Sequence, residues 1–150
     1  MSGYPTAAKE RIERPPIHPT VVSTSYVCLV GTLLTDLTYW RTADIMWADF
    51  SAWLISAGVI LGWLTTVVGL IVDAVGHRYY GTSARARTYA IGTLIVLVLA
   101  TLNMFVHTRD AWTSVVPWGL ALSAITVLVL LLTTCIGWAA LYRREIGLAT

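Results

Sequence analysis

Four long apolar runs, separated by short polar segments, dominate the hydrophobic pattern of this chain. They cover residues 20–40, 52–72, 89–106 and 117–141, and none of them contains Lys or Arg. An α-helix rises about 1.5 Å per residue, so about 20 apolar residues cross the hydrocarbon layer of a bilayer. The pattern predicts an all-α, polytopic membrane protein whose four transmembrane helices form an antiparallel bundle over residues 20–142.

The basic residues predict which ends of these helices face the cytoplasm. Only Arg41 and Arg109 fall on one side of the bundle. The other side holds the remaining eight of the ten, spread over the N-terminal tail (1–19), the loop between the second and third helices, and the C-terminal tail (143–150): Lys9, Arg11, Arg14, Arg78, Arg85, Arg87, Arg143 and Arg144. The positive-inside rule therefore places both termini and the middle loop in the cytoplasm.

Composition supports a lipid-facing chain. Hydrophobic residues make up 57% of the sequence and charged residues 12%, which is about half the charged fraction typical of soluble domains. The net charge of +2 is spread over several segments and forms no dense basic patch, so no nucleic-acid partner is expected. The lipid bilayer is the expected partner.

Small residues recur on two of the predicted helices and favour close helix packing. The second helix carries Gly58 and Gly62, followed by Gly69 and Gly76 at heptad spacing, and the fourth carries Gly119 and Ser123. We expect these positions to pack helices within one chain. A homodimer through Gly58 and Gly62 is the alternative.

Polar residues inside the apolar runs form the second pattern. A polar stripe follows positions 25, 28, 32, 36 and 39 of the first helix, and Asn103 and His107 share one face of the third. Asp36, Asn103 and His107 are the expected buried polar residues. A carboxylate within a membrane is costly, and Asp36 and Asp73 therefore need partners. Each either accepts hydrogen bonds from neighbouring helices, pairs with Arg41 or Arg78 at the membrane surface, or serves as a proton-handling or ligand-binding group.

Two histidines share the cytoplasmic end of the bundle. His18 begins the first helix and His77 ends the second, and two histidines at equal depth on facing helices can ligate a haem iron. Arg78 then pairs with a propionate, or Asp73 accepts a proton in quinone chemistry. These four residues are the candidate site for haem b or quinone, although histidine is also an ordinary choice at a membrane interface.

No catalytic motif and no metal-ligand spacing occurs in the sequence, so no enzymatic activity is expected. The leading hypothesis is a small membrane subunit that anchors or assembles with other protein subunits in a larger, respiratory or redox-linked complex. A b-type haem or quinone-binding electron-transfer protein is the first alternative. An oligomeric ion or proton pathway that uses Asp36 and Asp73 is the second.

Five segments together resemble a family of small bacterial membrane proteins known as a domain of unknown function. They are Ile17-His18-Pro19, the region of Asp36, the glycine-rich helix that ends in Asp73, the loop 81–85, and the stretch from Gly137-Trp138 to Ile146-Gly147. The resemblance implies a four-helix domain in the bacterial cytoplasmic membrane, linked to Rieske-type iron–sulfur proteins or periplasmic dehydrogenases. Many members of the family carry a histidine early in the third helix, where this chain has Tyr89-Ala90-Ile91-Gly92-Thr93.

Overall fold

The computed structural model describes residues 19–75, 84–109 and 115–147. The described chain is helical and contains no strand. Each helix includes a stretch long and apolar enough to cross a membrane, which confirms the predicted four-helix membrane bundle. The helices are α1 (Pro19–Thr42), α2 (Ile45–Ala74), α3 (Ala84–His107) and α5 (Trp118–Gly147).

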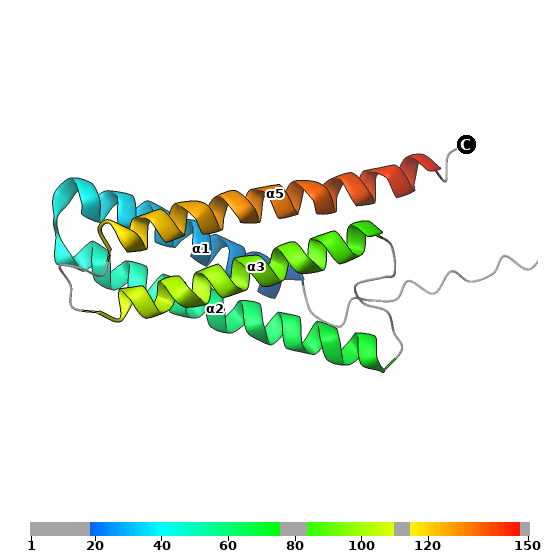
Figure 1. Ribbon diagram of the computed structural model, residues 1–150, viewed down its shortest axis with the longest axis horizontal. Helices are drawn as coiled ribbons and strands as arrows, with labels where there is room; N and C mark the ends of the chain where they lie inside the picture. The colour runs from blue at the N-terminus through cyan, green and yellow to red at the C-terminus, as the bar shows by residue number, and fades with distance from the viewer. Residues whose placement is uncertain (1–18, 76–83, 110–114, 148–150) are drawn as a thin grey trace, which may run out of the picture.

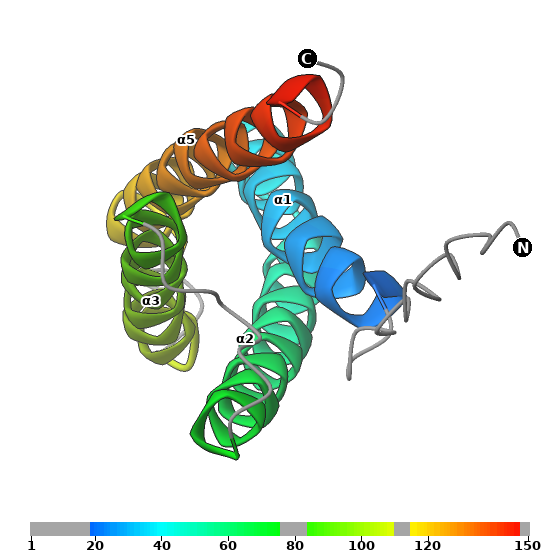
Figure 2. The ribbon, with the colours of Figure 1, turned by 90° about the vertical axis from the view of Figure 1, so that its right-hand side faces the viewer.

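The four helices run antiparallel to their neighbours and form two hairpins (Figure 1). α1 packs most extensively on α2, and α3 on α5, while smaller contacts join α1 to α5 and α2 to α3. Seen end on, the helices surround one axis in the order α1, α2, α3, α5 (Figure 2). We call the end where α1 starts and α5 finishes the terminal end, and the opposite end the distal end.

A two-residue turn at the distal end reverses the chain between α1 and α2. Ala43 adopts a left-handed conformation with φ of 55°. Asp44 then caps α2, because its carboxylate accepts a hydrogen bond of 3.0 Å from the backbone N–H of Met46. Because the turn has only two residues, α1 and α2 must pack side by side.

The helices extend beyond the apolar runs from which they were predicted. α2 begins at Ile45 rather than near residue 52, because Asp49 interrupts the apolar run without interrupting the helix and is exposed. α5 continues to Gly147, so its last turns carry Arg143 and Arg144. A helix of 30 residues is about 45 Å long, which exceeds the hydrocarbon thickness.

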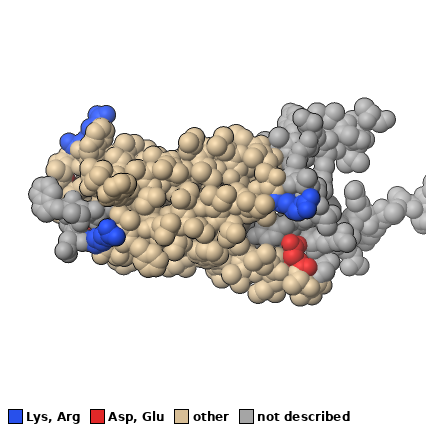
Figure 3. Space-filling model, in the orientation of Figure 1, with Lys and Arg blue, Asp and Glu red and all other residues tan. Residues whose placement is uncertain are grey.

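The bundle is apolar outside and partly polar inside, the reverse of a soluble protein. Large apolar side chains such as Val27, Trp53 and Ile60 are more than 60% exposed. Figure 3 shows a broad band free of charged residues between charges at the two ends. Small or polar side chains fill much of the interior: Ser25, Thr32, Asp36, Ser51, Asn103, His107, Ser123, Thr126 and Thr133.

The glycines of α2 allow the close approach of other helices. A Cβ atom at Gly58 would lie 3.1 Å from Leu29 Cδ2, and one at Gly62 would collide with Leu97 Cδ2 and lie 3.0 Å from Ser25 Oγ. The hydroxyl of Ser25 donates a 2.7 Å hydrogen bond to the carbonyl oxygen of Gly58. Both glycines are buried within the chain's own bundle.

Gly62→Ala is expected to lower the free energy of unfolding by about 1–3 kcal/mol, because the added methyl group displaces Leu97 and crowds Ser25. Unfolding of the purified protein in detergent measures the change. Ala57→Val, at an exposed position of the same helix, is the control and is expected to change stability by less than about 0.5 kcal/mol. Equal stability of wild type and Gly62→Ala would contradict this packing.

Candidate functional site

Four buried polar side chains meet near the distal end, and we call them the polar cluster. Asp36 comes from α1, Asn103 and His107 from α3, and Ser123 from α5. His107 Nε2 lies 3.0 Å from Asp36 Oδ1, and the Ser123 hydroxyl donates a 2.5 Å hydrogen bond to Asp36 Oδ2. Asn103 Nδ2 donates to Ser123 Oγ at 2.7 Å. None of the four is more than 7% exposed, so the cluster is a closed polar link between three helices.

The hydrogen bonds of His107 determine how many protons the cluster holds. Its Nδ1 lies 3.0 Å from the backbone oxygen of Asn103, which can only accept, so Nδ1 carries a hydrogen. One further proton must lie between Nε2 and the carboxylate of Asp36, because two acceptors do not bond to each other. The pair is either imidazolium with carboxylate or imidazole with carboxylic acid. In both forms its total charge is zero, which lowers the cost of burying it in a membrane.

Asp36 therefore has partners from neighbouring helices rather than a surface arginine. Arg41, one of the two expected alternatives, is exposed, and its guanidinium lies over the ring of Trp40 at 5.7 Å. The other, Arg78, lies outside the described residues.

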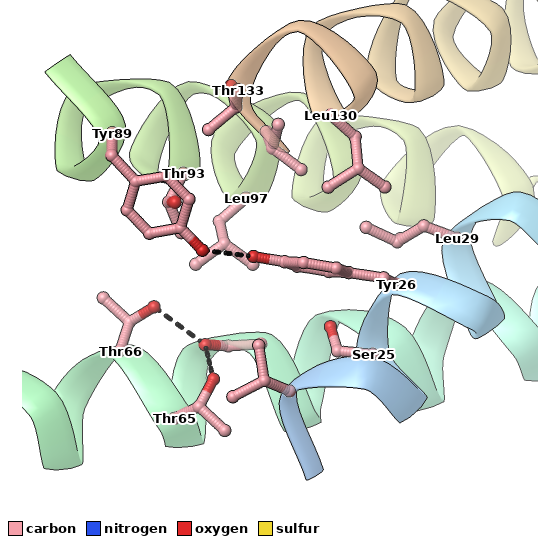
Figure 4. Close-up of a pocket in the computed structure, with 13 residues that line it drawn as sticks. Ser25, Tyr26, Leu29, Thr65, Thr66, Tyr89, Thr93, Leu97, Leu130 and Thr133 are labelled. Carbon is pink, nitrogen blue, oxygen red and sulfur yellow. Dashed lines mark hydrogen bonds between the residues drawn. The ribbon is translucent and has the colours of Figure 1, made fainter. Parts of the chain in front are cut away.

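A cavity of about 550 Å³ occupies the half of the bundle nearer the terminal end. All four helices contribute to its wall (Figure 4). The lining combines apolar side chains with seven hydroxyl-bearing ones: Ser25, Tyr26, Thr65, Thr66, Tyr89, Thr93 and Thr133. None of the described residues that line it is charged.

Two tyrosines join opposite walls of this cavity. The hydroxyls of Tyr26 on α1 and Tyr89 on α3 form a 2.9 Å hydrogen bond, drawn as a dashed line in Figure 4. Thr65 and Thr66 both donate to the backbone oxygen of Gly62. The hydroxyl of Thr93, by contrast, is buried and has no hydrogen-bond partner. A ligand in the cavity would thus meet a tyrosine pair able to re-form its hydrogen bonds, with the unpartnered Thr93 hydroxyl behind the cavity wall.

An apolar layer separates the cavity from the polar cluster. Leu29, Val96 and Leu130 border the cavity and also belong to the buried core. Ala100, with an exposed fraction of 0%, belongs to the same core one turn nearer the cluster on α3. The interior consequently consists of a closed polar cluster, a thin apolar layer and an open hydroxyl-lined cavity.

The residues proposed from the sequence fall into three groups in the structure. Asp36, Asn103 and His107, expected to be buried and polar, meet in the polar cluster together with Ser123, which was expected only to pack helices. The glycines expected to pack helices are buried where the structure describes them, at positions 58, 62, 69 and 119. The candidate cofactor residues His18, His77 and Arg78, and also Gly76, lie outside the described residues.

Asp73, the remaining candidate cofactor residue, is partly buried in the last turn of α2. It lies seven residues beyond Thr66, about 10 Å along the helix on a similar face, and is not among the residues that line the cavity. The described residues contain no group of three or more His, Cys, Asp or Glu side chains that could hold a metal ion.

Sequence reasoning missed the cavity. Tyr89 and Thr93 are four residues apart and therefore share one face of α3, which is the pattern that could have indicated a polar wall. Tyr26 directly follows Ser25, which lies on the polar stripe of α1. The sequence does not reveal that these hydroxyls surround a space, because that depends on how far the helices stand apart.

Asp36→Ala and His107→Ala are each expected to destabilise the protein, because each leaves a buried polar partner without its hydrogen bond. In the double variant, the free energy of unfolding is expected to fall by less than the sum of the two single losses. The difference, which is the coupling energy of the pair, is expected to be about 1–2 kcal/mol. Unfolding of all four proteins in detergent measures this cycle. Asp49→Ala, at an exposed carboxylate, is the control, and additive losses would refute the pairing.

A model of the family described as "Predicted membrane protein (DUF2231)" matches residues 14–150. No curated protein and no solved structure matches the chain. The matched range includes all four helices, the polar cluster and the cavity. The chain therefore belongs to this family of predicted membrane proteins, as the resemblance of its motifs implied.

Proposed function

We propose that this membrane protein binds a neutral amphiphile of the quinone class, drawn from the bilayer into the cavity between its two helical hairpins. The observation that carries the proposal is a hydroxyl-lined, uncharged cavity inside a lipid-facing bundle. Its volume of about 550 Å³ falls within the usual range of small-molecule sites.

The chemistry of the lining favours a ring with carbonyl or hydroxyl oxygens. Tyr26, Tyr89 and Thr93 can donate hydrogen bonds to such oxygens, and the aromatic rings and Leu97 offer apolar contact to the ring faces. Thr93 alone among the lining hydroxyls is buried and unpartnered, so it can donate without losing another bond.

Other membrane ligands fit these walls less well. A charged phospholipid headgroup requires cationic partners, and haem requires axial ligands and partners for two propionates. The described lining has no histidine and no charged side chain. A haem site that uses His18 and His77, with Asp73 and Arg78 as the other candidate residues, stays a prediction from the sequence.

Decyl-ubiquinone is expected to bind the purified protein in detergent, as measured by isothermal titration calorimetry. Thr93→Val is expected to raise the dissociation constant about fivefold to tenfold, because it removes one hydrogen-bond donor and keeps the side-chain volume. Tyr89→Phe is expected to act in the same direction.

The matched control is Thr134→Val, because the Thr134 hydroxyl donates to the backbone oxygen of Leu130 in its own helix and does not line the cavity. Decanol, which has the tail without the ring, is the control ligand. Equal binding of decanol, or equal affinity of wild type and Thr93→Val, would refute headgroup recognition in this cavity.

A role as a subunit that assembles with other proteins is a second candidate. It is supported by the length of α5, which exceeds the hydrocarbon thickness and ends near Arg143 and Arg144. The positive-inside rule puts that end of the helix on the cytoplasmic side of a bacterial inner membrane. There it would offer a rigid contact to a cytoplasmic or membrane-bound partner, such as a component of a respiratory complex.

A fluorescent protein fused after Thr150 is expected to fluoresce in bacterial cells, because such reporters mature in the cytoplasm and the C-terminus is predicted to lie there. Size-exclusion chromatography of the same fusion in mild detergent is expected to give a species larger than one chain in a micelle. A dark fusion would contradict the topology, and a monomeric species would contradict stable assembly.

A further inference from the structure

Three buried side-chain polar atoms in the described part of the chain have no hydrogen-bond partner. They are Thr93 Oγ1, Asn103 Oδ1 and Thr126 Oγ1. Buried polar atoms without a hydrogen-bond partner are rare in native interiors, and each requires an explanation, such as a bond to a water molecule or an ion. All three lie on α3 and α5, the two helices of one hairpin.

These atoms are distributed along the hairpin from the polar cluster to the cavity. Asn103 belongs to the cluster and donates to Ser123. Thr126 lies three residues beyond Ser123 on the same buried face of α5, toward the cavity, and is 3% exposed. Leu130, one further turn along, already borders the cavity, whose wall also includes Thr93. The distance along α5 from Ser123 to Leu130 is about 10 Å.

We infer that Asp36 and His107 form a proton-exchange site that communicates with the cavity through a water molecule bound by Ser123, Asn103 and Thr126. An internal water requires two to four polar partners. The Asn103 carbonyl can accept from it, Thr126 can donate or accept, and Ser123 Oγ has a lone pair left.

Between the water and the Asp36–His107 pair, the proton needs one relay, at Ser123. A proton that reaches the water passes to Ser123 Oγ, while the proton of the Ser123 hydroxyl moves along its existing 2.5 Å hydrogen bond to Asp36 Oδ2. The pair gains one proton and changes from zero charge to +1, as imidazolium beside carboxylic acid. The reverse transfer returns the proton to the water and restores the neutral pair.

Apolar residues close the distal side of the polar cluster, so the proton is expected to reach the pair from the side of the cavity. Tyr39, Ala48 and Val115 form a buried apolar group at the distal end of the bundle, with exposed fractions of 8%, 6% and 0%. The other charged groups described on the helices and their ends are exposed or only partly buried, so none is enclosed with the pair: Arg41, Asp44, Asp49, Asp73, Arg87 and Arg109. Tyr39 is the nearest buried titratable side chain along α1.

Hydrogen–deuterium exchange of the His107 ring hydrogens tests the inference on the ligand-free protein, so its outcome does not depend on quinone binding. The protein is labelled with ¹⁵N-histidine, placed in nanodiscs and transferred to D₂O, and NMR follows the exchange. The sequence has three histidines, so the spectrum is simple to assign. Thr126→Val is expected to slow exchange by about tenfold or more, equivalent to about 1.4 kcal/mol in the barrier.

Three further variants separate the relay from a structural effect. Thr126→Ser restores the hydroxyl and is expected to exchange at the wild-type rate. Thr134→Val, whose hydroxyl bonds within α5, is expected to leave the rate unchanged. Val115→Ala loosens the distal apolar group and is also expected to have no effect. Thr126→Val is expected to fold, because valine has nearly the same shape as threonine and adds no polar group to the interior.

Two outcomes would overturn the inference. The first is an exchange rate that contradicts a role for the hydroxyl: an unchanged rate in Thr126→Val, or a slowed rate in Thr126→Ser. The second is acceleration by Val115→Ala, which would show that the proton leaves through the distal end.

Discussion

The hydrogen-bonded pair of Asp36 and His107 is the interaction on which the arrangement of this bundle depends. Lipid tails are as apolar as leucine, so helices in a bilayer gain little from burying apolar surface against one another. Polar groups must find partners within the protein or remain unsatisfied in hydrocarbon. Asp36 meets this requirement only where α1, α3 and α5 adopt one relative rotation and depth, and the pair therefore specifies the register of the two hairpins.

The same requirement explains why the interior is layered. Small and polar side chains from different helices meet at two depths, at the polar cluster and around the cavity, and Leu29, Val96 and Leu130 lie between them. The polar cluster is closed because its side chains bond to one another. Thr65 and Thr66 beside the cavity bond to the backbone of their own helix at Gly62, and such bonds do not draw neighbouring helices together.

The sequence predicts the helices well because hydrophobic length is a local property. It also identifies Asp36, Asn103 and His107 as inward-facing polar residues, since helical spacing alone puts them on polar stripes. The pairing of Asp36 with His107, 71 positions away, depends on tertiary packing and cannot be derived from either stripe. Ser123 illustrates the same limit, because a small residue suited to helix packing proves to donate to the carboxylate.

Two hydrogen-bonded pairs join α1 to α3, Asp36 with His107 and Tyr26 with Tyr89, and they differ in strength. This difference determines where the two hairpins can separate. At the distal end the pair of Asp36 and His107 is fully enclosed and reinforced by Ser123, so breaking it leaves buried groups unsatisfied. At the terminal end Tyr26 and Tyr89 are only partly buried and share one neutral hydrogen bond beside the cavity. Within each hairpin the helices are packed extensively. Separation of the hairpins at the terminal end therefore breaks a neutral hydroxyl contact that a ligand in the cavity can replace, whereas separation at the distal end breaks the entire polar cluster.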